Sequence, residues 1–245
     1  FAALLGFTVE EETWAALMNN AAVINRAAPP RLYEEFLKLF LSGKGGTIYQ
    51  LMRKGGLFSP LFPGFDEWLT RETDGFPHAR VGENLYWIDT RVARGETISP
   101  PLMIALMFGE YLEERAEGYR RQGTCFQDAM TAAVSDFVGE QAPLVTIPHR
   151  ISLAVREILM LQVRLGKIPG KRPQSVLSRP AFNDALDYLR CRCRFADQDS
   201  PFLIWWENYA KSKILPPVAA DDKNNAGKRP RRRRKRKPRT ATVSL

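Results

Sequence analysis

The chain has 245 residues, 44% hydrophobic and 26% charged, which is an ordinary composition for a globular protein with its own core. No run of about 18 apolar residues occurs, so the sequence predicts no membrane span. The formal net charge is +9. Residues 218–245 hold eleven Lys or Arg against two Asp or Glu, so this segment carries the whole excess and the remainder is neutral.

The three cysteines are an odd number in a chain of this size, which favours a reducing compartment, and we expect a cytoplasmic protein. Cys191 and Cys193 are two residues apart in a helical pattern, on opposite faces, so packing is favoured over zinc binding. Phe1 to Leu5 resembles the end of a helix without its start, and the first residue is not Met. The sequence is therefore interpreted as a fragment.

After this opening, Thr8 is a candidate cap for a helix whose buried stripe would be Trp14, Leu17 and Met18. Pro29 and Pro30 then fix the start of a strongly apolar helical hairpin that extends to Pro63. Its first helix has apolar residues on most of its circumference, which is typical of a helix buried on several sides. We expect this hairpin to be the centre of the fold.

Further helices are expected at 65–69, 79–93, from Pro100 to Gly123, at 125–141 with Thr124 as cap, and at 148–165, 180–195 and 200–212. No segment alternates with a period of two beside hairpin turn signals. The sequence therefore predicts an all-α multi-helix bundle. Residues 221–245 have no periodicity, and we expect them to be a disordered basic tail.

No catalytic or metal-binding residues are expected in this chain. Ser42-Gly-Lys-Gly-Gly-Thr47 has neither the spacing nor the preceding strand of a phosphate loop, so it is interpreted as a helix connection. Asp197 and Asp199 lie between helices, where a cap is favoured over a magnesium pair. Neither His78 nor His149 has a partner that indicates a nucleophile.

Nucleic-acid binding is predicted at two places. The helix that begins at Ile147-Pro-His-Arg150 offers free amides to a phosphate, which His149, Arg150 and Arg156 could assist, although a merely charged first turn is the alternative. The tail has ten cations in twelve residues and should bind RNA or DNA non-specifically, with membrane-surface or nuclear-import roles as alternatives. These cations are Lys228, Arg229, Arg231, Arg232, Arg233, Arg234, Lys235, Arg236, Lys237 and Arg239.

Several motifs, in order, resemble the neck, body and tail of bacterial poly(A) polymerases, relatives of the tRNA CCA-adding enzymes. The opening Phe1-Ala-Ala-Leu-Leu-Gly-Phe7 is similar to the end of the family's neck helix. Pro29, Arg31, Leu32, Glu34 and Glu35 match P-x-R-L-x-E-E. Ile147, Pro148 and Arg150 match I-P-x-R, and Trp205-Trp206 matches a late W-W pair. Ala28-Pro-Pro-Arg31 departs from the S-x-E-R-I of CCA-adding relatives, and with the cationic tail it favours poly(A) addition.

The resemblance implies a neck at 1–63, an RNA-binding body at 64–217 and the basic tail at 218–245. It further implies a monomeric enzyme that adds AMP from ATP to RNA 3′ ends without a template. Mg²⁺ and ATP would be held by a catalytic head absent here, so this chain alone should bind neither and be inactive. Arg31 would either pair with Glu35 or support the nucleotide pocket with it. The alternatives are a CCA-adding tRNA nucleotidyltransferase body and a non-catalytic RNA-binding adaptor.

Overall fold

The computed structural model describes residues 1–71, 76–167, 173–195 and 200–214, and the side chains within these ranges except those of residues 195, 213 and 214. The described residues form helices joined by short loops, with no strand among them, which confirms the all-α prediction. None of these helices is both long and apolar enough to cross a membrane. The helices are α1 (Ala2–Leu5), α2 (Glu11–Asn19), the 3₁₀ helix η1 (Ala21–Arg26), α3 (Pro29–Phe40), α4 (Gly45–Lys54), α5 (Phe58–Leu61), α6 (Pro63–Leu69), α7 (Pro77–Ala93), α8 (Pro100–Arg121), α9 (Phe126–Gln141), α10 (His149–Leu165), α11 (Gln174–Leu177), α12 (Phe182–Phe195) and α13 (Pro201–Ile214).

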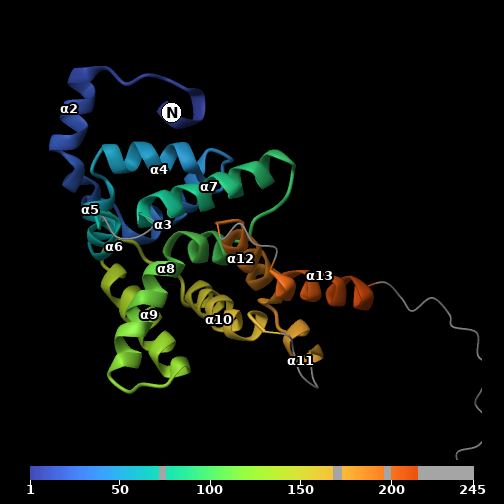
Figure 1. The fold of residues 1–245 in the computed structure, drawn as a ribbon. Helices are drawn as coiled ribbons and strands as arrows, with labels where there is room; N and C mark the ends of the chain where they lie inside the picture. Colours follow the sequence, from blue (N-terminus) through green and yellow to red (C-terminus); the bar gives the residue numbers. More distant parts are fainter. Residues whose placement is uncertain (72–75, 168–172, 196–199, 215–245) are drawn as a thin grey trace, which may run out of the picture.

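Helix α8 is the centre of the fold, and α7, α9, α10 and α12 pack around it (Figure 1). It begins where Pro100 and Pro101 follow Ser99, whose hydroxyl accepts a hydrogen bond from the Leu102 amide at 3.1 Å. Eleven of its residues are buried, from Leu102 through Leu112 and at Ala116, with Glu110 the exception in that run. The expectation that the 29–63 hairpin forms the centre is therefore wrong, because α8 has the most buried residues and contacts α7, α9, α10 and α12.

The hairpin formed by α3 and α4 packs at one side of this centre. Tyr33, Phe36 and Phe40 are the buried residues of α3, whereas Leu37 and Leu39 are only half-buried. The Phe36 ring lies 5.3 Å from that of Phe62. Helix α3 is thus buried along one stripe and not on several sides. An aromatic cluster links it to α5, α6, α8 and α9; its members are Phe36, Phe58, Phe62, Phe65, Phe108, Tyr111 and Phe137.

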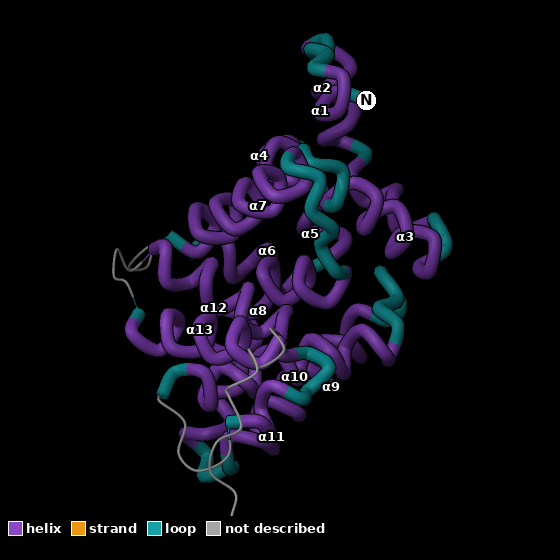
Figure 2. Tube along the Cα trace, turned by 90° about the vertical axis from the view of Figure 1, so that its right-hand side faces the viewer, coloured by secondary structure: helices purple, strands orange, loops and turns teal. Residues whose placement is uncertain are grey.

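Helices α1 and α2 stand at the edge of the molecule, apart from the main body (Figure 2). Helix α2 has no buried residue, and Met18 is 46% exposed, so the predicted buried stripe is wrong. The predicted cap at Thr8 is also wrong, because the helix begins only at Glu11 and Thr8 lies too far ahead of its first amides. Similarly, Cys125 and not Thr124 precedes α9.

Candidate nucleic-acid interface

The starts of α3 and α10 meet in the fold. The Thr146 amide donates a hydrogen bond to the Pro29 carbonyl at 3.2 Å, which joins the α9–α10 connection to the first turn of α3. Pro148 is the N-cap residue of α10 and His149 is its first residue, as the I-P-x-R pattern predicted. Two helix N-termini, each with free amides and a partial positive charge, therefore lie at one end of the body.

Basic side chains lie at or near this junction. Arg31, His149 and Arg150 are exposed, and Arg156 is half-buried about two turns further along α10. Arg150 lies close enough to the Tyr33 hydroxyl to lower its pKa, although burial has the larger effect and the pKa of Tyr33 is raised overall. The structure thus brings the α3 and α10 candidates near one another, which the sequence could not reveal.

The proposed ion pair between Arg31 and Glu35 is not formed. Glu35 instead binds Lys38, with 2.8 Å between Oε1 and Nζ. The pKa of Glu35 is lowered chiefly by this hydrogen bond and charge, and Arg31 contributes least. Within the described residues Arg31 has no ion pair, so its guanidinium remains available to a ligand.

A hollow of about 270 Å³ lies beside the start of α10, between that helix and α9. His149 and Arg156 stand on its α10 side, and Thr131 and Ser135 line its α9 side. The floor is apolar and includes Val134 and Val138. A cavity lined by aliphatic, hydroxyl and basic side chains can accept a group that is flat and apolar in one part and anionic in another.

The glycine-rich connection before α4 is already occupied by an anion of the protein itself. Asp89 accepts hydrogen bonds from the amides of Gly45 and Gly46, at 2.7 and 2.9 Å. A Cβ at position 46 would lie 2.5 Å from the ring of Tyr86, so glycine is required there. This finding agrees with the interpretation of the motif as a helix connection. Sequence reasoning missed Asp89 because it lies 43 residues or more away.

Cys191 packs in the core, and its thiol donates to Asn84 Oδ1 at 3.1 Å. Burial raises the pKa of this thiol to about 12, which makes it a poor metal ligand. Among the described residues no group of three His, Cys, Asp or Glu side chains could hold a metal ion. Asp197, Asp199 and all ten tail cations lie outside the described residues.

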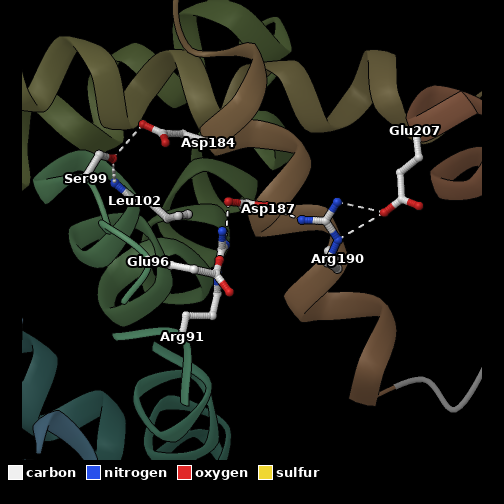
Figure 3. A network of polar contacts seen from close by, with 8 residues as sticks. All are labelled: Arg91, Glu96, Ser99, Leu102, Asp184, Asp187, Arg190 and Glu207. Carbon is white, nitrogen blue, oxygen red and sulfur yellow. Dashed lines mark hydrogen bonds and ion pairs between the residues drawn. The ribbon is translucent and has the colours of Figure 1, made fainter. Parts of the chain in front are cut away.

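A polar network attaches the last two helices to the body (Figure 3). Asp187 of α12 pairs with Arg91 of α7 and with Arg190, and Arg190 pairs with Glu207 of α13 at 2.7 Å. Asp184 accepts a hydrogen bond from Ser99 at 2.6 Å, which connects α12 to the start of α8. The network fixes α13, the last described helix before the basic tail, to the same body that presents the α9–α10 hollow.

Comparison with known protein families gives two matches. Residues 6–69 match the family model "Probable RNA and SrmB-binding site of polymerase A", and residues 122–240 match "Polymerase A arginine-rich C-terminus". The second range contains α9 and α10 with the hollow, as well as residues 218–240 of the tail.

Similar proteins include poly(A) polymerase I of Escherichia coli O6:H1, 32% identical over 98% of this chain and 53% of that protein. The Salmonella typhi poly(A) polymerase I is 31% identical over the same shares. The Haemophilus influenzae poly(A) polymerase I is 29% identical over 85% of this chain and 47% of that protein's length. The chain spans about half the length of the curated relatives that it matches.

Proposed function

We propose, on the premise that this chain belongs to the poly(A) polymerase family, that it is the RNA-binding portion of an enzyme that adds AMP from ATP to RNA 3′ ends without a template. The observation that carries the proposal is the order of the two matched regions along one chain. An RNA-binding region precedes an arginine-rich C-terminus, and together they span most of its length.

Within this portion we assign three parts: a neck at 1–63, a body at 64–217 and a basic tail at 218–245. The tail would raise RNA affinity through its ten cations, since each neutralised phosphate releases counterions. His149, Arg150 and Arg156 would contact RNA at the start of α10. Their exposure, and the hollow between α9 and α10, support this assignment.

Arg31 would support the nucleotide pocket from the first turn of α3. Its exposed guanidinium, which forms no ion pair with a described residue, supports this role. Glu35 pairs with Lys38 and would therefore contribute less to the pocket than Arg31. The described residues do not form a site for the Mg²⁺ ions that such an enzyme uses, because no three His, Cys, Asp or Glu side chains among them are placed to hold a metal ion together. We therefore assign Mg²⁺ and ATP to a part of the enzyme beyond this chain.

The proposed setting is messenger RNA processing in the cytoplasm, by a monomer. Three free cysteines, one of them exposed, support a reducing compartment. The CCA-adding and adaptor alternatives predict different chemistry, so a single assay separates the three.

The test is incorporation of labelled nucleotide into a short RNA by this chain alone and by a chain that also carries the preceding half of its relatives. We expect no product from this chain, and AMP addition with ATP and Mg²⁺ from the longer one. Addition of CTP-derived residues to a tRNA that lacks its end would instead identify a CCA-adding enzyme. An inactive longer chain that still bound RNA would identify an adaptor, and incorporation by this chain alone would contradict the proposal.

A further inference from the structure

A second hollow lies along the same pair of helices as the hollow beside His149. This second hollow has a volume of about 200 Å³ and lies between the start of α9 and the end of α10. Phe126 and Gln127 line it from α9, and Met160 and Arg164 line it from α10. Glu157 of α10 and its ion-pair partner Arg179, from the segment before α12, line it as well. Because α9 and α10 run antiparallel, the two hollows follow one another along a single seam, which we name the α9–α10 furrow.

The furrow extends along most of α10. His149 and Arg164 mark its two ends and are fifteen residues apart, which corresponds to roughly 22 Å along a helix. His149, Arg156 and Arg164 are separated by seven and eight residues, close to two helical turns each, so they lie on one face. This spacing places the Arg156 guanidinium in the middle of the furrow and the Arg164 guanidinium at one end, with the His149 imidazole at the other.

Among the described residues, no carboxylate of α9 forms an ion pair with a basic side chain of the furrow. Helix α9 has three carboxylates: Asp136 accepts from the Tyr119 hydroxyl, Glu140 binds Arg115 at 2.6 and 2.7 Å, and Asp128 accepts from the Cys125 thiol. Two of them therefore bind residues of α8 and not of α10.

Glu157 is the only carboxylate of α10, and it pairs with Arg179 at 3.5 Å. Arg150, Arg156 and Arg164 make no ion pair with any described residue. The furrow therefore keeps two guanidinium groups without an ion pair to a described residue, those of Arg156 and Arg164, next to the Glu157–Arg179 pair.

We infer that the α9–α10 furrow is a binding track for single-stranded RNA, in which guanidinium groups hold phosphates and the two apolar hollows accept base faces. The inference rests on the proposed function and adds the path of the strand. Single-stranded RNA suits the furrow because its unstacked bases offer flat apolar faces between regularly spaced phosphates. Duplex RNA presents phosphates and 2′-hydroxyls but keeps its base faces stacked, so it cannot use the hollows.

The walls also predict how selective the track is. Phe126, Met160 and Val163 contribute apolar surface in the second hollow, and Val134 and Val138 do so in the first. Such surfaces accept the face of any base. Gln127, Thr131 and Ser135 also line the hollows and offer hydrogen-bonding groups, so the track should hold RNA of any sequence with modest base preferences.

The test compares single charge reversals in the full chain. Arg156→Glu and Arg164→Glu alter the furrow, and Arg94→Glu is the matched control: Arg94 is exposed, follows the end of α7 and makes no ion pair among the described residues. Anisotropy of a labelled oligoadenylate should show binding about tenfold weaker for each furrow variant and unchanged within about twofold for the control. Arg156→Lys keeps the charge and should recover most of the affinity.

Binding to duplex RNA, measured in parallel, should be equally strong for the furrow variants and for Arg94→Glu. The inference is overturned if the furrow variants bind oligoadenylate as Arg94→Glu does, or if they lose duplex binding to the same extent. Failure of the unmodified chain to bind any RNA would instead refute the proposed function itself. RNA carrying 4-thiouridine gives a second readout, because its crosslinks should map to peptides of α9 and α10. Crosslinks confined to residues 218–245 would contradict the track.

Discussion

Asp89 accepts a hydrogen bond from the Gly45 amide at 2.7 Å, across 44 residues of sequence. The second carboxylate oxygen binds the next amide, so one side chain of α7 satisfies two free donors at the start of α4. A carboxylate at a helix N-terminus also complements the helix dipole. The contact thus fastens the α3–α4 hairpin to α7 and occupies the position that a phosphate would need.

Replacing Asp89 with Ala should destabilise the protein by about 1–3 kcal/mol, because two amides lose a charged acceptor. Glu83→Ala on the same helix is the control, since Glu83 is exposed and should change stability by less than about 0.5 kcal/mol. Denaturant unfolding measures both. Equal midpoints for the two variants would show that the Asp89 contact does not stabilise the fold.

Gly109 of α8 should not tolerate a side chain. A Cβ there would lie 2.5 Å from the hydroxyl oxygen of Tyr188, whose ring is fully buried and cannot move away. Gly109→Ala should therefore cost about 1–3 kcal/mol.

Gly118→Ala is the matched control on the same helix, because nothing lies within 4 Å of its Cβ position. It should raise stability by about 0.5–1 kcal/mol through helix propensity. The two substitutions should thus shift the thermal midpoint in opposite directions, and shifts of the same sign would contradict the packing described for α8 and α12.

Tyr33 and Tyr49 provide a pair of buried hydroxyls with different partners. The Tyr33 hydroxyl has no hydrogen-bond partner in the described part of the chain, whereas Tyr49 donates to the His78 carbonyl at 3.0 Å. Tyr33→Phe should leave stability unchanged or raise it, because it removes an unsatisfied polar group.

Tyr49→Phe should cost about 0.5–1.5 kcal/mol, since the carbonyl loses its donor. Chemical denaturation of both variants tests the contrast. A larger loss for Tyr33→Phe than for Tyr49→Phe would mean that the Tyr33 hydroxyl has a partner after all.

The ionisation of Asp184 should lower the free energy of unfolding as the pH rises. Burial raises its pKa, although the hydrogen bond from Ser99 opposes this effect. Below the unfolded pKa, near 4, Asp184 is neutral in both states. Above it the unfolded state ionises first, so this group's contribution to stability is lost as the pH rises through the folded pKa.

Asp184→Asn removes this titration. The free energy of unfolding of the unmodified protein, minus that of the variant, should therefore decline from pH 4 upward. A series of denaturation curves across that range measures the difference. A difference that stays flat or increases would show that burial does not raise this pKa.

The sequence predicts the helices well and their burial poorly. Prolines at 29, 30, 100, 101 and 148 mark the starts of α3, α8 and α10, because proline restricts the backbone locally. Burial depends instead on contacts distant in sequence. Trp14 and Met18 have helical spacing, yet Met18 is exposed and Trp14 is only half-buried, against the end of α4. Leu37 and Leu39 look like core residues, but α3 packs along one stripe only.

In the candidate interface, too, local features could be predicted from the sequence and contacts between distant segments could not. His149, Arg150 and Arg156 are recognisable because a proline-initiated helix start with nearby cations suits a phosphate. The second hollow could not be predicted, since Phe126, Arg164 and Arg179 converge only when α9, α10 and the segment before α12 are folded together. The pairing of α9 carboxylates with Tyr119 and Arg115 was equally hidden, and it is what leaves the furrow cationic.

The central claim is that the helical body binds RNA by itself and that the tail only adds affinity. The most direct measurement is the affinity of residues 1–217 and of the full chain for the same single-stranded RNA across a salt series. We predict that residues 1–217 still bind, with a shallower dependence on salt because the ten tail cations are missing. Loss of all RNA binding on removal of residues 218–245, with the helices still folded, would contradict the claim.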